Sequence, residues 1–246
     1  MSTDAGVVRE ADPAPGKAGL WEDFVDIFYA PSSVFARRAD GKWGLPLLIL
    51  IIAGTALFFL TRNSLSSVMD AEFARQSAAA MRKNPNLTQE QLSSGRNFFE
   101  TFGPIFFALG LTVSVLLTGV ALWLVGKLFD AKESVAAALM VATYSEVPRL
   151  VQILTNAAQG LFLPAEKLNS INAVSFSLAR FLDPDQTSPI MVALASRVDV
   201  FTIWITVLLA IGLAVVGRIP RQQAAIAAAI VWLLGALPAM LGALRS

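Results

Sequence analysis

The sequence contains neither cysteine nor histidine among its 246 residues. Their absence excludes disulfide bonds, thiol nucleophiles and imidazole bases, together with the usual ligands of zinc, copper and haem. Charged residues are also scarce, at 15%, against about a quarter in an average soluble domain. The net charge of +1 provides no overall field that would attract a nucleic acid. We therefore expect no metal, no cofactor and no nucleic-acid partner.

The residues that are abundant are apolar, at 55% of the chain with a mean hydropathy of +0.62. A helix needs about 20 apolar residues to cross a hydrocarbon core of about 30 Å. Windows of this kind predict an all-α, polytopic membrane helix bundle with five transmembrane helices plus amphipathic interfacial helices, in contact with the lipid bilayer. The five windows are residues 43–61, 101–126, 134–159, 200–217 and 222–244.

The beginning of the chain differs from the rest. Residues 1–20 are rich in Asp, Pro and Gly and lack a continuous apolar run, which is typical of a disordered tail and not of a cleavable signal peptide. The membrane domain then covers residues 21–244. Basic residues near the span ends divide almost equally between the two sides, but the short loops "KLFDAKE" and "RIPRQQ" each carry two. Since short loops weigh most under the positive-inside rule, we expect these loops and the N-terminus in the cytoplasm.

Two stretches between the windows are not membrane-like. Residues 63–100 indicate an aqueous helical hairpin, in which Asn84–Pro85 ends the first helix and Thr88 caps a short second one. Residues 160–199 indicate one amphipathic helix that ends at Asp183–Pro184 and either packs on its neighbours or contacts the membrane surface or a partner. Its apolar stripe consists of Leu168, Ile171, Val174, Leu178, Phe181 and Leu182.

The third window contains two charged residues in the segment "ATYSEVPRLVQIL". Glu146 and Arg149 are three residues apart, so they share a helix face and are expected to form an intramembrane ion pair. Pro148 between them removes a backbone hydrogen bond and predicts a kink. The pair is either a structural link within the bundle or a site for a ligand or proton.

Enzyme signatures are missing from the sequence. There is no G-x-S-x-G motif, no Walker-type glycine loop and no intramembrane pair of aspartates, and Glu146 is the single acidic residue within a predicted span. We therefore predict that the protein is not an enzyme and assign no catalytic residue.

Polar and small residues at the ends of the bundle allow two interpretations each. Arg37, Arg38 and Lys42 precede the first span and suit either membrane-interface anchoring or recognition of anionic lipid headgroups. Beside them, the ring of Phe35 is expected to lie in the interface. In the last span, small residues recur every four positions, which favours close helix packing or a homo-oligomer contact. They are Gly235, Ala239 and Ala243.

The order of these parts resembles the Yip1-domain integral membrane proteins. The likeness rests on a Pro-x-x-x-Phe turn, a Trp-x-x-Pro motif at the first span and a Tyr-x-x-x-Pro motif in the third. The matching residues are Tyr29, Pro31, Phe35, Trp43, Pro46, Tyr144 and Pro148. The resemblance implies a five-helix domain with a cytosolic N-terminus, and it makes these residues candidates for partner contact.

Eukaryotic members of that family act in vesicle traffic between endoplasmic reticulum and Golgi and contact Rab-type GTPases and one another. The present chain departs from them, because it has "DIFYAP" with Ala30 where the vesicular members have a glycine, and because its tail is short. It is more similar to prokaryotic relatives, which implies a bacterial inner membrane.

Two functions remain open from the sequence. The first is a non-enzymatic scaffold or adaptor that organises partner proteins or lipids in the membrane. The second is a permease or channel for a small solute, an ion or a lipid, in which Glu146 and Arg149 of the kinked third span meet the transported species.

Overall fold

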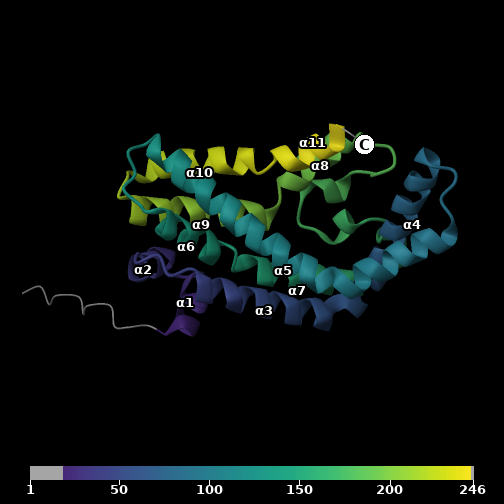
Figure 1. Cartoon of the computed structure of the whole chain (residues 1–246), viewed down its shortest axis with the longest axis horizontal. Coiled ribbons are helices and arrows are strands. Elements are labelled where there is room, and N and C mark those ends of the chain that lie inside the picture. Colours follow the sequence, from purple (N-terminus) through teal and green to yellow (C-terminus); the bar gives the residue numbers. More distant parts are fainter. Residues whose placement is uncertain (1–18, 245–246) are drawn as a thin grey trace, which may run out of the picture.

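The computed structural model describes residues 19–244 as a bundle of helices that run along one long axis (Figure 1). No β-strand occurs within this range, so the predicted all-α fold is confirmed. The predicted tail at residues 1–20 lies outside the described residues except for its last two.

The chain enters the bundle through two short helices, α1 (Leu20–Asp26) and α2 (Pro31–Arg37), before the first apolar helix, α3 (Gly44–Thr61). Pro31 is the first residue of α2, where its missing N–H costs no hydrogen bond. The turn into α3 requires a glycine at position 41, because φ is +77° there and a Cβ atom would overlap the backbone of Ala136.

The next segment contains the short 3₁₀ helix η1 (Arg62–Leu65), α4 (Ser66–Lys83) and α5 (Gln89–Lys127). Thr88 caps α5 as predicted: its hydroxyl accepts from the Gln91 N–H, and the Gln91 side chain accepts from the Thr88 N–H. The prediction of a short second helix is wrong, since α5 continues without a break for 39 residues. At about 1.5 Å per residue, its length of about 58 Å exceeds the hydrocarbon core by almost twofold.

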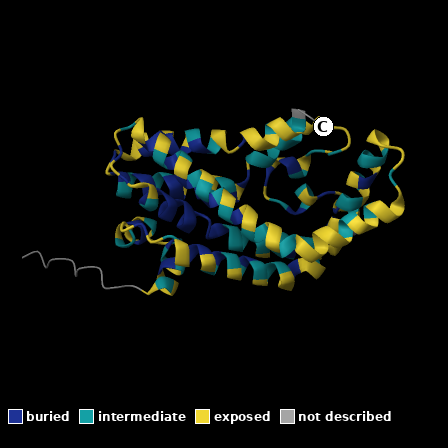
Figure 2. Ribbon diagram, in the orientation of Figure 1, coloured by how far each residue is buried: buried dark blue, intermediate teal, exposed yellow. Residues whose placement is uncertain are grey.

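The centre of the fold is α6 (Val135–Ser145), whose residues from Ala137 to Ser145 are all buried. It packs between α5 and α9 (Val200–Gly217), and at Gly212 of α9 an added Cβ atom would overlap Val141. The chain breaks at Glu146–Val147 and resumes as α7 (Pro148–Phe162), so the predicted kink at Pro148 is confirmed. Figure 2 shows this buried centre and the exposed surfaces of α4 and of the start of α5.

Residues 163–199 do not form the predicted amphipathic helix. They form the 3₁₀ turns η2 (Ala165–Lys167), η3 (Ile171–Val174) and η4 (Leu178–Phe181), followed by α8 (Pro189–Arg197). Leu168 and Val174 are buried with Val68 of α4, whereas Phe181 is exposed, so the stripe does not share one face. Local competition for backbone groups by Ser175 accounts for this, since its hydroxyl donates to the Asn172 carbonyl and accepts from the Ser177 N–H.

The chain ends with α10 (Arg221–Leu234) and α11 (Leu237–Leu244), which an interruption at Gly235–Ala236 separates. Within the described residues, four helical stretches are long and apolar enough to cross a membrane: Gly44–Lys83, Gln89–Lys127, Val200–Gly217 and Arg221–Ala243. The helices α6 and α7 have 11 and 15 residues and are each too short alone. That together they make a fifth crossing stays a prediction.

Candidate functional site

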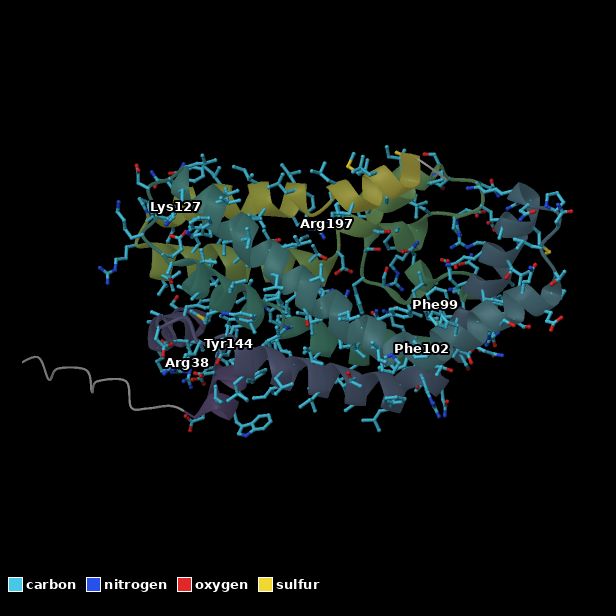
Figure 3. The ribbon with its side chains drawn as sticks, in the orientation of Figure 1. Arg38, Phe99, Phe102, Lys127, Tyr144 and Arg197 are labelled. Carbon is cyan, nitrogen blue, oxygen red and sulfur yellow. The ribbon has the colours of Figure 1, made fainter. Side chains whose placement is uncertain are left out.

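A buried carboxylate connects the first two helices to the centre of the bundle. Asp23 of α1 is fully buried, and its Oδ1 accepts from Nε and Nη2 of Arg37 at 3.2 and 2.7 Å. Its Oδ2 accepts from Nε of Arg38 and, at 3.4 Å, from the hydroxyl of Tyr144 on α6. Figure 3 places Arg38 and Tyr144 at this end of the bundle. We call Asp23, Arg37, Arg38 and Tyr144 the entrance cluster.

The entrance cluster contains Arg37 and Arg38, two basic residues that the sequence predicted at the membrane interface. Both pair with Asp23 inside the protein. The side chains of Arg37 and Arg38 are only 16% and 23% exposed, and Arg37 also donates to Asp26 at 2.7 Å. Burial lowers the pKa of Arg37, but its hydrogen bonds to the two aspartates outweigh burial and raise it. Lys42 differs because it is exposed and pairs with Asp40. Its predicted contact with lipid headgroups stays a prediction.

The motif residues divide into a buried and an exposed group. Phe35 is fully buried and its ring contacts α9 beside Gly212, so the expectation that it lies in the membrane interface is wrong. Pro46 is buried in the first turn of α3 and Pro148 is buried at the start of α7, while Trp43 is half-buried.

Tyr29 belongs to the exposed group of motif residues, with 82% of its surface exposed. It extends an exposed row on α1 that also contains Trp21, 71% exposed, and Val25. Trp21 and Val25 are four positions apart on α1 and share one face, and Tyr29 lies in the turn that follows α1. We call them the α1 face.

At the break between α6 and α7, the predicted ion pair is present. Arg149 Nε donates to Glu146 Oε2, and Arg149 Nη1 lies 3.4 Å from Gln152 Oε1. Gln152 Nε2 in turn donates to Asp199 Oδ1 at 3.3 Å. The same oxygen of Asp199 caps α9 by accepting from the N–H groups of its first turn.

Arg197 lies at the end of α8, next to the break between α10 and α11 (Figure 3). Its guanidinium lies 5.9 Å from the Trp232 ring centroid and donates to the Trp232 carbonyl at 3.0 Å. It is also close enough to interact electrostatically with Arg149 and Glu146. The breaks at α6/α7, α8/α9 and α10/α11 therefore meet around one set of charged side chains, of which Glu146 and Asp199 are buried. Asp199 and Arg197 were not among the residues predicted from the sequence, although an Asp directly before an apolar run is a helix-capping signal.

A third buried charge lies in the loop between α5 and α6. The side chain of Glu133 is fully buried, 3.7 Å from Lys127 Nζ, and faces the Cα atoms of Gly126 and Gly217. Burial raises the pKa of this carboxyl. Among residues 19–244, neither carboxylate oxygen has a hydrogen-bond partner, and no group of three potential metal-ligating residues occurs.

Comparison with known proteins gives one match. The Yip1 domain matches residues 25–242, which include Arg37, Arg38 and Tyr144 of the entrance cluster but not Asp23, and all apolar helices except the last residues of α11. Searches of curated proteins and of solved structures give no significant match. The match covers most of the chain, and it agrees with the order of the motifs and with the all-α bundle of apolar helices. This multi-pass membrane protein therefore belongs to the Yip1 domain family.

Proposed function

We propose that the protein is a non-enzymatic scaffold of the bacterial inner membrane that holds a partner protein on the α1 face, with its N-terminus in the cytoplasm. The observation that carries this proposal is an exposed aromatic surface on a helix that cannot move freely. Trp21 and Tyr29 are more than two-thirds exposed, while Asp23 on the opposite side of α1 is fully buried.

The entrance cluster makes the α1 face suitable for binding. Exposed aromatic side chains are over-represented among the residues that dominate protein interfaces. Binding is stronger when the surface is already ordered, because less conformational entropy is lost. Arg37, Arg38 and Tyr144 hold Asp23, so α1 with Trp21 and Val25 is held in one orientation.

The packing of α6 favours the scaffold over a permease. A transport path through the third predicted span would have to pass along α6, but this helix is buried on every side from Ala137 to Ser145. Close packing of this kind provides a fixed support for α1 and α2 and closes this half of the bundle to solutes.

The scaffold function is tested by photo-crosslinking in native membranes from a reactive residue at Val25. We expect discrete protein adducts that disappear in the Trp21→Ala/Tyr29→Ala double variant. A matched control is Leu48→Ala, which removes an exposed apolar side chain from α3 and leaves the adducts unchanged. Adducts with lipid alone, or protein adducts that persist in the double variant, contradict the proposal.

A further inference from the structure

The polar side chains of α7 lie along one face of the helix. Arg149, Gln152, Asn156 and Gln159 are spaced by three and four residues, which aligns them on a helix. Most of the other positions of α7 are apolar, among them Leu150, Ile153, Leu154, Ala157 and Leu161. We call the first set the α7 polar face. A helix with this pattern that lies inside a membrane bundle turns its polar side away from lipid.

The contacts of the α7 polar face lie inside the protein. Gln152 donates to Asp199 at the start of α9. Gln159 Nε2 donates to the Val174 carbonyl at 2.8 Å, and Gln159 Oε1 accepts from Arg180 Nη2, also at 2.8 Å. Polar groups therefore line α7 from the Glu146–Arg149 pair to the turn η4.

The outer end of this face lies next to a cavity that the turns after α7 form. The cavity has a volume of about 480 Å³, and one of its lining residues is Arg180, which donates to Gln159 of the α7 polar face. Its other polar lining residues are Glu166, Lys167, Asn169 and Asp183. Since a water molecule occupies about 30 Å³ in the liquid, the cavity is large enough for several waters and for a small solute.

The inner end also has open polar surface. The side chain of Arg149 remains 37% exposed although its ion-pair partner Glu146 is buried. Asp199 Oδ2 and Arg197 Nε are buried and have no hydrogen-bond partner among residues 19–244. Buried polar atoms of this kind are normally satisfied by water when protein groups do not reach them.

We propose that the α7 polar face is an aqueous access path, open only at the Arg180 end, which brings water and small hydrophilic solutes to the Glu146–Arg149 pair. The buried helix α6 closes the path beyond Glu146. This inference does not depend on the scaffold function, because none of the residues that form the path belongs to the α1 face.

The natural lack of cysteine makes this path directly testable, since each cysteine variant carries a single thiol. The variants Gln159→Cys, Asn156→Cys and Gln152→Cys are exposed in sealed vesicles to a charged, membrane-impermeant thiosulfonate reagent added to one face at a time. Lys42→Cys reports the α1 face side and Asn86→Cys, in the loop between α4 and α5, reports the other. Leu154→Cys is the control on the exposed apolar side of α7.

We expect labelling of all three polar positions from the side that labels Asn86→Cys, with rates that fall from Gln159 to Gln152. Each rate is expected to exceed that of Leu154→Cys by at least about tenfold, because a charged reagent partitions poorly into hydrocarbon. Labelling after denaturation verifies that each thiol is present. Labelling rates no higher than that of Leu154→Cys, or equal labelling from both faces, overturn the proposal. Because the three positions are tested separately, the result stays decisive if one variant misfolds.

Discussion

Removing the charge of Asp23 tests whether the entrance cluster holds α1 and α2 on the bundle. Asp23→Asn keeps the size of the side chain but removes the carboxylate that Arg37 and Arg38 share, while Arg37 keeps Asp26 at 2.7 Å. Breaking a buried ion pair costs about 3–5 kcal/mol. Because both arginines retain some exposure and one keeps a second acid, we expect the lower end of this range, about 3 kcal/mol.

The assay is unfolding in mixed detergent and sodium dodecyl sulfate micelles, followed by tryptophan fluorescence and extrapolated to zero denaturant. The matched control is Lys42→Ala, because Lys42 also pairs with an aspartate but is exposed, and such pairs are worth about 1 kcal/mol or less. A loss for Asp23→Asn as small as the loss for Lys42→Ala refutes the reasoning that the cluster fixes α1.

Three further predictions concern single positions elsewhere in the fold. Burial holds the pKa of Glu133 in the folded protein above its pKa in the unfolded chain. Between these two pKa values the unfolded chain releases the proton more readily, so the unfolding free energy falls as the pH rises. Glu133→Gln is expected to remove this slope in unfolding titrations between about pH 4 and about pH 8, and an unchanged slope contradicts the burial argument. Gly212→Val forces a side chain against Val141 and is expected to lower the unfolding free energy by about 1–3 kcal/mol. The control Gly110→Val is expected to be neutral, because no atom lies within 4 Å of an added Cβ there. Equal losses of unfolding free energy for the two variants argue against close α6–α9 packing. Thr88→Ala removes the cap of α5 and is expected to cost about 1 kcal/mol, seen as faster hydrogen exchange in the first turn of α5, and unchanged exchange there contradicts the capping role.

Local chemistry was predictable from the sequence. The Glu146–Arg149 pair, the break before Pro148 and the cap at Thr88 each depend on residues at most three positions apart. At such separations the helical repeat alone decides which side chains can meet. The apolar windows were predictable for a similar reason, because hydrocarbon thickness sets the length of a membrane helix.

Contacts between distant segments were not predictable in this way. Asp23 and Tyr144 are separated by 121 residues, and Gln152 and Asp199 by 47. No periodicity within either segment indicates the partner in the other. Arg37 and Arg38 were therefore interpreted as residues at the membrane surface, whereas the fold uses both to neutralise a buried aspartate.

The incorrect prediction of one helix at residues 160–199 has a different cause. Its apolar residues recur with helical spacing, but Ser175 and Ser177 lie between them, and the Ser175 hydroxyl bonds to the Asn172 carbonyl and to the Ser177 hydroxyl. Such residues stabilise turns at the expense of a continuous helix. The spacing of the apolar residues alone therefore predicted a helix, because it takes no account of these local hydrogen bonds.

The entrance cluster also has a consequence for the order in which contacts can form while the chain is synthesised. Asp23 meets Arg37 and Arg38 within 15 residues, and all three precede α3 in the chain. Since a growing chain folds from its N-terminus, the acid acquires its counter-charges before the first membrane helix is complete. When α6 is synthesised more than 100 residues later, it closes over a unit whose charges are already matched. Tyr144 then needs to supply only a hydroxyl, because the two arginines already pair with the carboxylate.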